Sequence, residues 1–250
     1  MADPQGLASV IRAATSEKGF SRRHRVLASI PAFHSVCRTL ELPDLPEVRA
    51  DVAIPQQARR DFGYSAENSI LLWQPLASVG GRPRFLVVSA PREPVITLVE
   101  TFRLAGLHPD RIETVTFALS RAVNQPQAII VAAEPNGLDS IILKDGIPLA
   151  TRSTFLGEGP HDPESLTTLV TGALDTIVSF YNESYPDKPM PPDIPVYVLG
   201  SALSLNPNVV SAVEMALGHP VSQFEPPILY PEHFLKAEFA VNIGLMLRML

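Results

Sequence analysis

The chain has 250 residues, of which 46% are hydrophobic and 18% charged, which is the composition of a globular protein with a sizeable core. Its net charge of −6 argues against nucleic acid as a partner, because phosphate binding needs a basic surface. The single cysteine, Cys37, excludes an internal disulfide, and no apolar stretch approaches the roughly 20 residues that span a bilayer. We therefore expect a soluble protein of a reducing compartment, built as one composite domain or a few small lobes.

The first half of the chain alternates between helical and extended patterns. In chain order we expect a helix over 7–14, strands over 25–30 and 35–42, a helix over 45–62, strands over 69–76 and 84–90, and a helix over 93–105. Pro55 marks a break or a first turn, a Gly-Gly turn joins the last two strands, and Gly106 ends the last helix. That helix should pack on its sheet through Val95, Leu98, Val99 and Leu104.

A new unit is expected to begin near residue 112. The predicted elements are strands over 128–133, 138–143 and 147–152, a helix over 162–181, a strand over 196–200, a helix over 206–217, a short strand over 220–224 and a helix over 234–250. Asp162 followed by Pro163 is typical of a capped helix start. The last helix is apolar on all sides, which favours a core helix over a membrane anchor. This alternation predicts an α/β protein with mixed sheets.

Several short blocks occur in an order and spacing that one protein family shares. They include Cys37-Arg-Thr-Leu-Glu-Leu-Pro43, Phe85-Leu-Val-Val-Ser-Ala-Pro-Arg-Glu-Pro94, Arg103-Leu-Ala-Gly-Leu-His-Pro109 and Val196-Tyr-Val-Leu-Gly-Ser201. In these blocks the chain resembles PilM-type proteins of the type IV pilus machinery, from about Leu7 onward. The resemblance implies the actin-like (ribonuclease H-like) ATPase fold of FtsA with an inserted small α/β subdomain.

The resemblance also implies a division of the chain. Residues 1–34 would be a remnant of the first actin-like subdomain, 35–109 the inserted small subdomain, and 110–250 the second lobe with the returning C-terminal helix. The family opens with a glycine-isoleucine-aspartate strand whose turn cradles phosphate, and no such block precedes Val26. We therefore expect the first phosphate-loop strands to be absent, and two explanations stay open: an N-terminal truncation, or a protein that never had these strands.

The remaining nucleotide positions depart from the family pattern. The second phosphate loop would fall on Ala132, Ala133 and Glu134, so that an alanine replaces the metal-facing aspartate and a glutamate replaces the glycine. The family's adenosine loop carries a double glycine, and the corresponding segment Gly200-Ser201-Ala202 matches it only in part. A degenerate cleft would comprise Glu134, Asn136, Gly137, Gly200, Ser201 and Ala202. The alternative is two ordinary turns. Either way, the resemblance disfavours ATP and Mg²⁺ as cofactors and an enzymatic role.

Other chemical groups favour structural interpretations. Asp139 is more typical of a solvent-facing strand carboxylate than of a metal ligand, and Cys37 of a packed thiol rather than a nucleophile. The cluster Arg22–Arg25 indicates a solvated turn, with an acidic partner as the alternative. No paired metal spacing connects the six histidines, which are His24, His34, His108, His161, His219 and His233.

The function that the resemblance implies is a cytoplasmic scaffold of a type IV pilus or related secretion platform. Its partners would be other pilus assembly proteins and the N-terminal tail of a PilN-like inner-membrane protein. The tail would bind beside the small subdomain and recruit the chain to the inner face of the membrane. The acidic balance favours a basic tail and binding that weakens with salt. Two alternatives stay open, an ATP-binding FtsA-like switch and a free-standing binding module, and so does a homo-oligomer.

Overall fold

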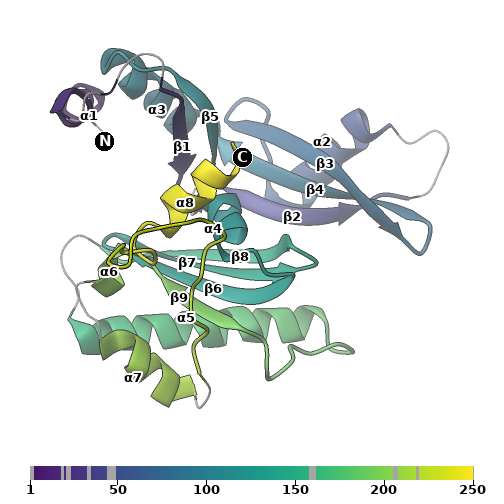
Figure 1. The fold of residues 1–250 in the computed structure, drawn as a ribbon. Coiled ribbons are helices and arrows are strands. Elements are labelled where there is room, and N and C mark those ends of the chain that lie inside the picture. The colour runs from purple at the N-terminus through teal and green to yellow at the C-terminus, as the bar shows by residue number, and fades with distance from the viewer. Residues whose placement is uncertain are drawn as a thin grey trace. The chain divides into compact units, whose positions relative to one another are not determined.

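The computed structural model describes residues 3–17, 20, 24–32, 35–43, 49–157, 162–204, 208–217 and 220–249. The chain forms two compact units, Met1–Thr114 and Val115–Leu250 (Figure 1). Each unit combines helices with sheets, as the sequence predicts. The finer boundaries at residues 34 and 109 stay predictions.

One part of the first unit is a parallel strand pair with two helices. β1 (Val26–Ile30) pairs with β5 (Pro109–Thr114). α1 (Pro4–Glu17) packs against α3 (Arg92–Leu104), and the Arg12 guanidinium donates a hydrogen bond to the Leu104 carbonyl. The expected sheet-facing side of α3 is wrong at Val99, which is exposed although α3 also packs against α1.

The other part of this unit is a three-stranded antiparallel sheet. Its order is β2 (Val36–Glu41), β4 (Arg82–Pro91) and β3 (Ser69–Val79), so the predicted central strand is confirmed. α2 (Ala50–Phe62) covers one face, and the small core there consists of Leu40, Leu42, Ile54 and Val87, with Leu71 and Phe85 at its edge.

Two turns of this unit differ in how well the sequence predicts them. Gly80 and Gly81 have φ angles of 59° and 78°, which glycine adopts without a Cβ penalty, and they make the expected hairpin turn. Pro55 lies inside α2 (Ala50–Phe62) beyond its first turn and does not interrupt it, so neither the break nor the first turn expected there occurs. Residues 44–48, where that helix was expected to begin, lie outside the described residues.

The second unit is built on a four-stranded sheet. Its order is β8 (Ile147–Phe155), β7 (Gly137–Lys144), β6 (Gln127–Glu134) and β9 (Val196–Leu199). β6 and β9 are parallel and the other pairs are antiparallel. Every residue of β9 is buried, which suits a strand covered on both faces.

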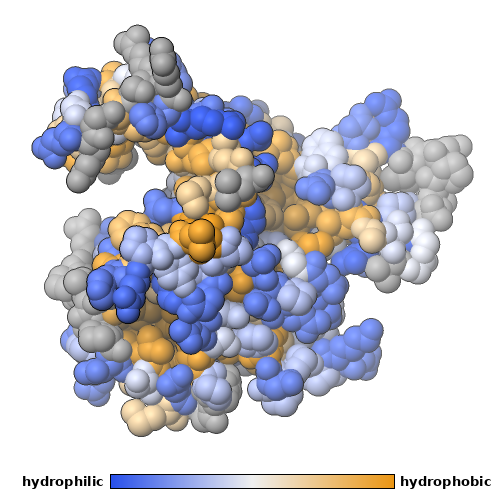
Figure 2. Space-filling model, in the orientation of Figure 1, coloured by the Kyte–Doolittle hydropathy of each residue, from blue (hydrophilic) through white to orange (hydrophobic). Residues whose placement is uncertain are grey.

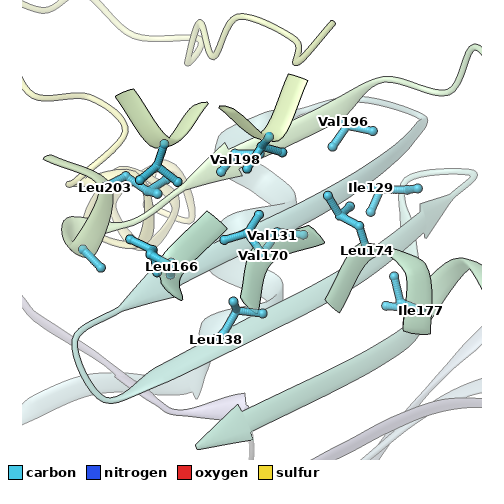
Figure 3. Packing of buried hydrophobic residues seen from close by; sticks show 14 of the residues in the cluster. Ile129, Val131, Leu138, Leu166, Val170, Leu174, Ile177, Val196, Val198 and Leu203 are labelled. Carbon is cyan, nitrogen blue, oxygen red and sulfur yellow. The ribbon is translucent and has the colours of Figure 1, made fainter. Parts of the chain in front are cut away.

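Helices cover both faces of this sheet. On one side lie α5 (Pro163–Ser184) and α7 (Asn208–Leu217), which belong to the same core cluster, and Figure 3 shows apolar side chains of α5 meeting those of β6, β7 and β9. On the other side lie α4 (Val115–Val123) and α8 (Ala240–Leu247). The predicted cap of α5 is confirmed, since the Asp162 carboxylate accepts a hydrogen bond from the Ser165 N–H at 2.9 Å.

The sequence misjudges the chain after β9. A one-turn helix, α6 (Ser201–Ser204), was not expected. Residues 220–224 form no strand, although the Ser222 N–H donates to the Val196 carbonyl at 2.7 Å. The last helix begins at Ala240 rather than at residue 234, because the preceding residues form turns in which the rings of Phe234 and Phe239 stack.

Candidate functional site

The ends of two parallel strands bring a carboxylate and a serine together. Register pairs Ala132 of β6 with Leu199 of β9, so Glu134 and Ser201 emerge at the same end of the sheet. The Ser201 hydroxyl donates a hydrogen bond to Oε2 of Glu134. Two positions that the sequence assigns to a degenerate nucleotide cleft are therefore joined directly to each other.

Gly200 makes the close approach of these two segments possible. Its φ is +110°, and a Cβ built on it would lie 2.2 Å from the carbonyl oxygen of Ala133. Its N–H donates to the Ala237 carbonyl at 3.0 Å. Only glycine suits this place, because any side chain would collide with the backbone of β6.

A second carboxylate lies on the neighbouring strand. Asp139 on β7 pairs with Ser153 on β8 and with Ala132 on β6. The Ser153 hydroxyl donates to Oδ1 of Asp139, and the carboxylate is half-buried. The expectation of a solvent-facing carboxylate is wrong here, because Asp139 lies on the same face of β7 as the buried Ile141. We call Glu134, Asp139, Ser153 and Ser201 the strand-end cluster.

Burial shapes the electrostatics of the strand-end cluster. It raises the pKa of Glu134, and the nearby Glu238 raises it further, while the hydrogen bonds from Ser201 oppose the rise. Burial also raises the pKa of Asp139 to about 6, with the charge of Glu134 adding to the rise and the Ser153 hydroxyl opposing it. The cluster is thus an acidic environment in which two carboxylates disfavour each other's charge.

The other predicted cleft residues do not join the cluster. Ala202 is buried in the core between the sheet and α5. Asn136 is exposed at the β6–β7 turn, where its carbonyl accepts from the Leu156 N–H at 3.0 Å, and Gly137 begins β7. Sequence reasoning missed Ser153 as a partner of Asp139, although strand periodicity places Asp139 on a buried face.

The strand-end cluster does not fit a magnesium-bound nucleotide. A phosphate site offers free donors and a cation, whereas here the Ser201 donors are taken by the Glu134 carboxylate. Glu134, Asp139 and Glu238 would all repel phosphate. Within the described residues, no group of three or more His, Cys, Asp or Glu side chains could hold a metal ion.

A second candidate surface lies on the three-stranded sheet of the first unit. On the face opposite α2, Leu72 of β3 pairs with Val88 of β4, next to Ile70 and Leu86. Leu72 is 65% exposed, and the other three are half-buried. Apolar side chains gather over this sheet in Figure 2. We call these four residues the open sheet face, which an apolar partner could cover.

The remaining candidates have structural roles or lie outside the described residues. Cys37 is buried, which raises the pKa of its thiol to about 12, as suits a packed thiol. Arg25 pairs with Asp110 at 3.7 Å. Arg22, Arg23, His34, His161 and His219 lie outside the described residues. Among the described helices, none has the length and apolar character to cross a bilayer.

Comparison with solved structures identifies the fold. No protein-family model and no curated protein matches the chain. A PilM–PilN type IV pilus biogenesis complex is similar over 99% of this chain and 86% of the other, with a TM-score of 0.73 and 21% identity. The cytoplasmic domain of EpsL, an inner-membrane component of the type II secretion system of Vibrio cholerae, matches over 99% and 82%, with a TM-score of 0.56 and 11% identity.

A third neighbour comes from a different system. The ethanolamine utilization protein EutJ from Carboxydothermus hydrogenoformans matches over 98% of this chain and 74% of the other, with a TM-score of 0.51 and 14% identity. The chain therefore has a PilM-like, actin-like α/β fold, as its sequence predicts.

Proposed function

Starting from a PilM-like fold that extends over 99% of the chain, we propose that the protein is a component of the assembly platform of a type IV pilus or a type II secretion system. Two of its neighbours belong to such systems, one in complex with PilN and one as part of an inner-membrane protein. The near-complete coverage is the observation that carries this proposal. In this role the chain acts as a scaffold rather than as an ATPase.

The proposed partner is the N-terminal tail of a PilN-like inner-membrane protein. The open sheet face offers the tail an apolar surface, and β3 is an edge strand, to which an extended peptide can add through main-chain hydrogen bonds. A net charge of −6 favours a tail that also carries lysine or arginine. Binding to such a tail would recruit the chain to the inner face of the membrane.

Binding to immobilised tail peptide tests the proposed surface. Leu72→Asp should abolish binding, because it places a charge within the apolar contact without disturbing the α2 side of the sheet. Leu229→Asp is the matched control, since Leu229 is fully exposed and lies in the other unit. Equal binding of the tail peptide by both variants would show that the open sheet face is not the partner site.

The proposed scaffold role predicts weak nucleotide binding. Calorimetry with Mg-ATP should give an affinity no tighter than the millimolar range, which corresponds to about 4 kcal/mol of binding free energy. The reason is that Glu134 occupies the Ser201 donors and brings negative charge. Micromolar affinity of the unmodified chain would favour the ATP-binding switch instead. The Mg-ATP affinity of Glu134→Gly measures how far this one carboxylate accounts for the weak nucleotide binding.

A further inference from the structure

A small cavity lies in the second unit, at the opposite end of β7 from the strand-end cluster. Its volume is about 160 Å³, and it opens where the end of β7 meets the connection between α5 and β9. The walls are mostly apolar, and two of the chain's four lysines line it. The residues that matter below are Ile142, Lys144, Tyr181, Lys188, Met190 and Ile194.

Lys144 is held at this cavity by aromatic side chains. Its Nζ donates a hydrogen bond to Oη of Tyr181 at 3.1 Å. The same nitrogen lies 5.7 Å from the ring centroid of Tyr181 and 5.9 Å from that of Tyr185, within the range of cation–π attraction. An ammonium has three N–H donors, so two of them stay available to a ligand.

Tyr181 supplies a third donor. Its side chain is only 4% exposed and belongs to the core of the unit. The hydroxyl oxygen of Tyr181 accepts a hydrogen bond from Lys144. Within the part of the chain that the structure describes, the hydroxyl proton of Tyr181 has no acceptor. A buried donor without an acceptor is unfavourable, and an anion beside Lys144 would satisfy it.

The connection after α5 completes the cavity with a second cation. The backbone N–H of Lys188 donates to the Tyr185 carbonyl at 3.0 Å, and that of Met190 to the Asn182 side-chain oxygen at 2.8 Å. These bonds fix the segment that lines the opening. In the part of the chain that the structure describes, neither Lys144 nor Lys188 forms an ion pair with a carboxylate.

We propose that this cavity binds a carboxylate carried on a short aliphatic body. The carboxylate would accept hydrogen bonds from Lys144 and Tyr181 with Lys188 nearby, and the aliphatic body would lie against Ile142 and Ile194. A cavity of about 160 Å³ is too small for a nucleotide. Such a group is supplied by a free small acid or by an aliphatic C-terminal residue of a peptide.

Methyl NMR of the whole chain tests this proposal with three probes. We expect 4-methylpentanoate to shift the methyl signals of Ile142, Met190 and Ile194 with saturation. The neutral 4-methylpentanamide has the same shape and should bind at least about tenfold more weakly, because it lacks the charge. N-acetyl-leucine separates the two sources: tighter binding than 4-methylpentanoate indicates a peptide C-terminus, and weaker binding a free acid. Equal binding of acid and amide, or no saturation with the acid, overturns the proposal.

Variants locate the site. Lys144→Met and Tyr181→Phe should each weaken binding of 4-methylpentanoate about tenfold or more, while Tyr181→Phe keeps the ring in the core. Lys236→Met removes the same charge elsewhere in this unit and should bind as the unmodified chain does. Unchanged binding by Lys144→Met contradicts the proposal, and the comparison of acid with amide needs no variant at all.

Discussion

At the scale of single residues, carboxylates of the chain itself accept the hydrogen bonds that a bound anion would accept in the strand-end cluster. Glu134 takes the hydrogen bonds of Ser201, and Asp139 takes that of Ser153. In a phosphate site those donors would be free and the surroundings positive. Here, burial raises the pKa of both carboxyl groups, and both accept hydrogen bonds from serines of the chain itself. The cluster is therefore better suited to linking neighbouring strands than to binding an anion.

Asp139 should make the stability of the second unit depend on pH. Its pKa rises from an ordinary 3.8 to about 6, which is equivalent to roughly 3 kcal/mol. Burial favours the protonated form, so this contribution to stability is complete below about pH 4 and is lost as pH rises through about 6. Asp139→Asn should therefore melt at a higher temperature than the unmodified chain at pH 7.5, and the difference should vanish near pH 4.

Ser153→Ala is the control for this pH dependence. It keeps a titrating Asp139 but removes the hydrogen bond that lowers its pKa, so the loss of stability above pH 6 should become larger. If Asp139→Asn gives the same change in melting temperature at pH 4 and pH 7.5, Asp139 does not carry the pH dependence.

Gly200 is the residue whose replacement should harm the cluster most. Gly200→Ala should lower the free energy of unfolding by more than about 2 kcal/mol, since it adds a strained φ and a collision with Ala133. Gly172→Ala in α5 is the matched control, because a Cβ there meets nothing within 4 Å. It should stabilise by about 0.5 to 1 kcal/mol. Urea titration measures both, and a loss below about 0.5 kcal/mol for Gly200→Ala would contradict the close approach.

At the scale of elements, a glycine lets helices α4 and α8 cross in close contact. A Cβ on Gly244 would lie 1.8 Å from the Ala118 carbonyl oxygen, and the Arg121 guanidinium donates to the Gly244 carbonyl at 3.0 Å. Small residues at a crossing let the two backbones approach closely. The α4–α8 layer that covers one face of the sheet therefore depends on this position.

Gly244→Ala should destabilise the second unit by several kcal/mol, although alanine favours a helix by about 1 kcal/mol over glycine. The collision outweighs the propensity because the opposing atom belongs to backbone. Asn242→Ala, at an exposed position of the same helix, is the control and should change stability by less than about 0.7 kcal/mol. Equal unfolding midpoints for the two variants in urea would show that the helices lie further apart.

The sequence predicts an element well when the signal for that element is local, and poorly when its conformation depends on packing against distant segments. Strand β6 and helix α5 carry local signals, a continuous apolar run and an Asp-Pro start, and both form as predicted. Residues 220–239 also contain apolar side chains, and Phe224, Ile228 and Phe234 among them pack on the core of the second unit, but this segment forms no helix or strand. Short range periodicity does not distinguish these two causes.

At the scale of the whole molecule, the fold follows from an ordered set of weak signals. No block that resembles PilM is specific alone, but their order extends along nearly the whole chain, and so does the structural match. The candidate site is harder to predict because it depends on contacts between distant segments. The sequence indicates Glu134 and Ser201 separately, whereas the hydrogen bond between them appears only once β6 and β9 pair.

The central claim, that the chain binds the tail of an inner-membrane partner, can be measured with its only tryptophan. Trp73 lies on the edge strand β3 and is 39% exposed. It pairs with Val87 and so lies on the α2 side of the sheet, opposite Leu72, and its fluorescence should report a tail that adds to the edge of β3. We expect a synthetic N-terminal peptide of the cognate PilN-like protein to change Trp73 emission with saturation, and to bind more weakly as salt rises. Equal responses to the cognate and a scrambled peptide, or no response at high micromolar peptide, would contradict the account.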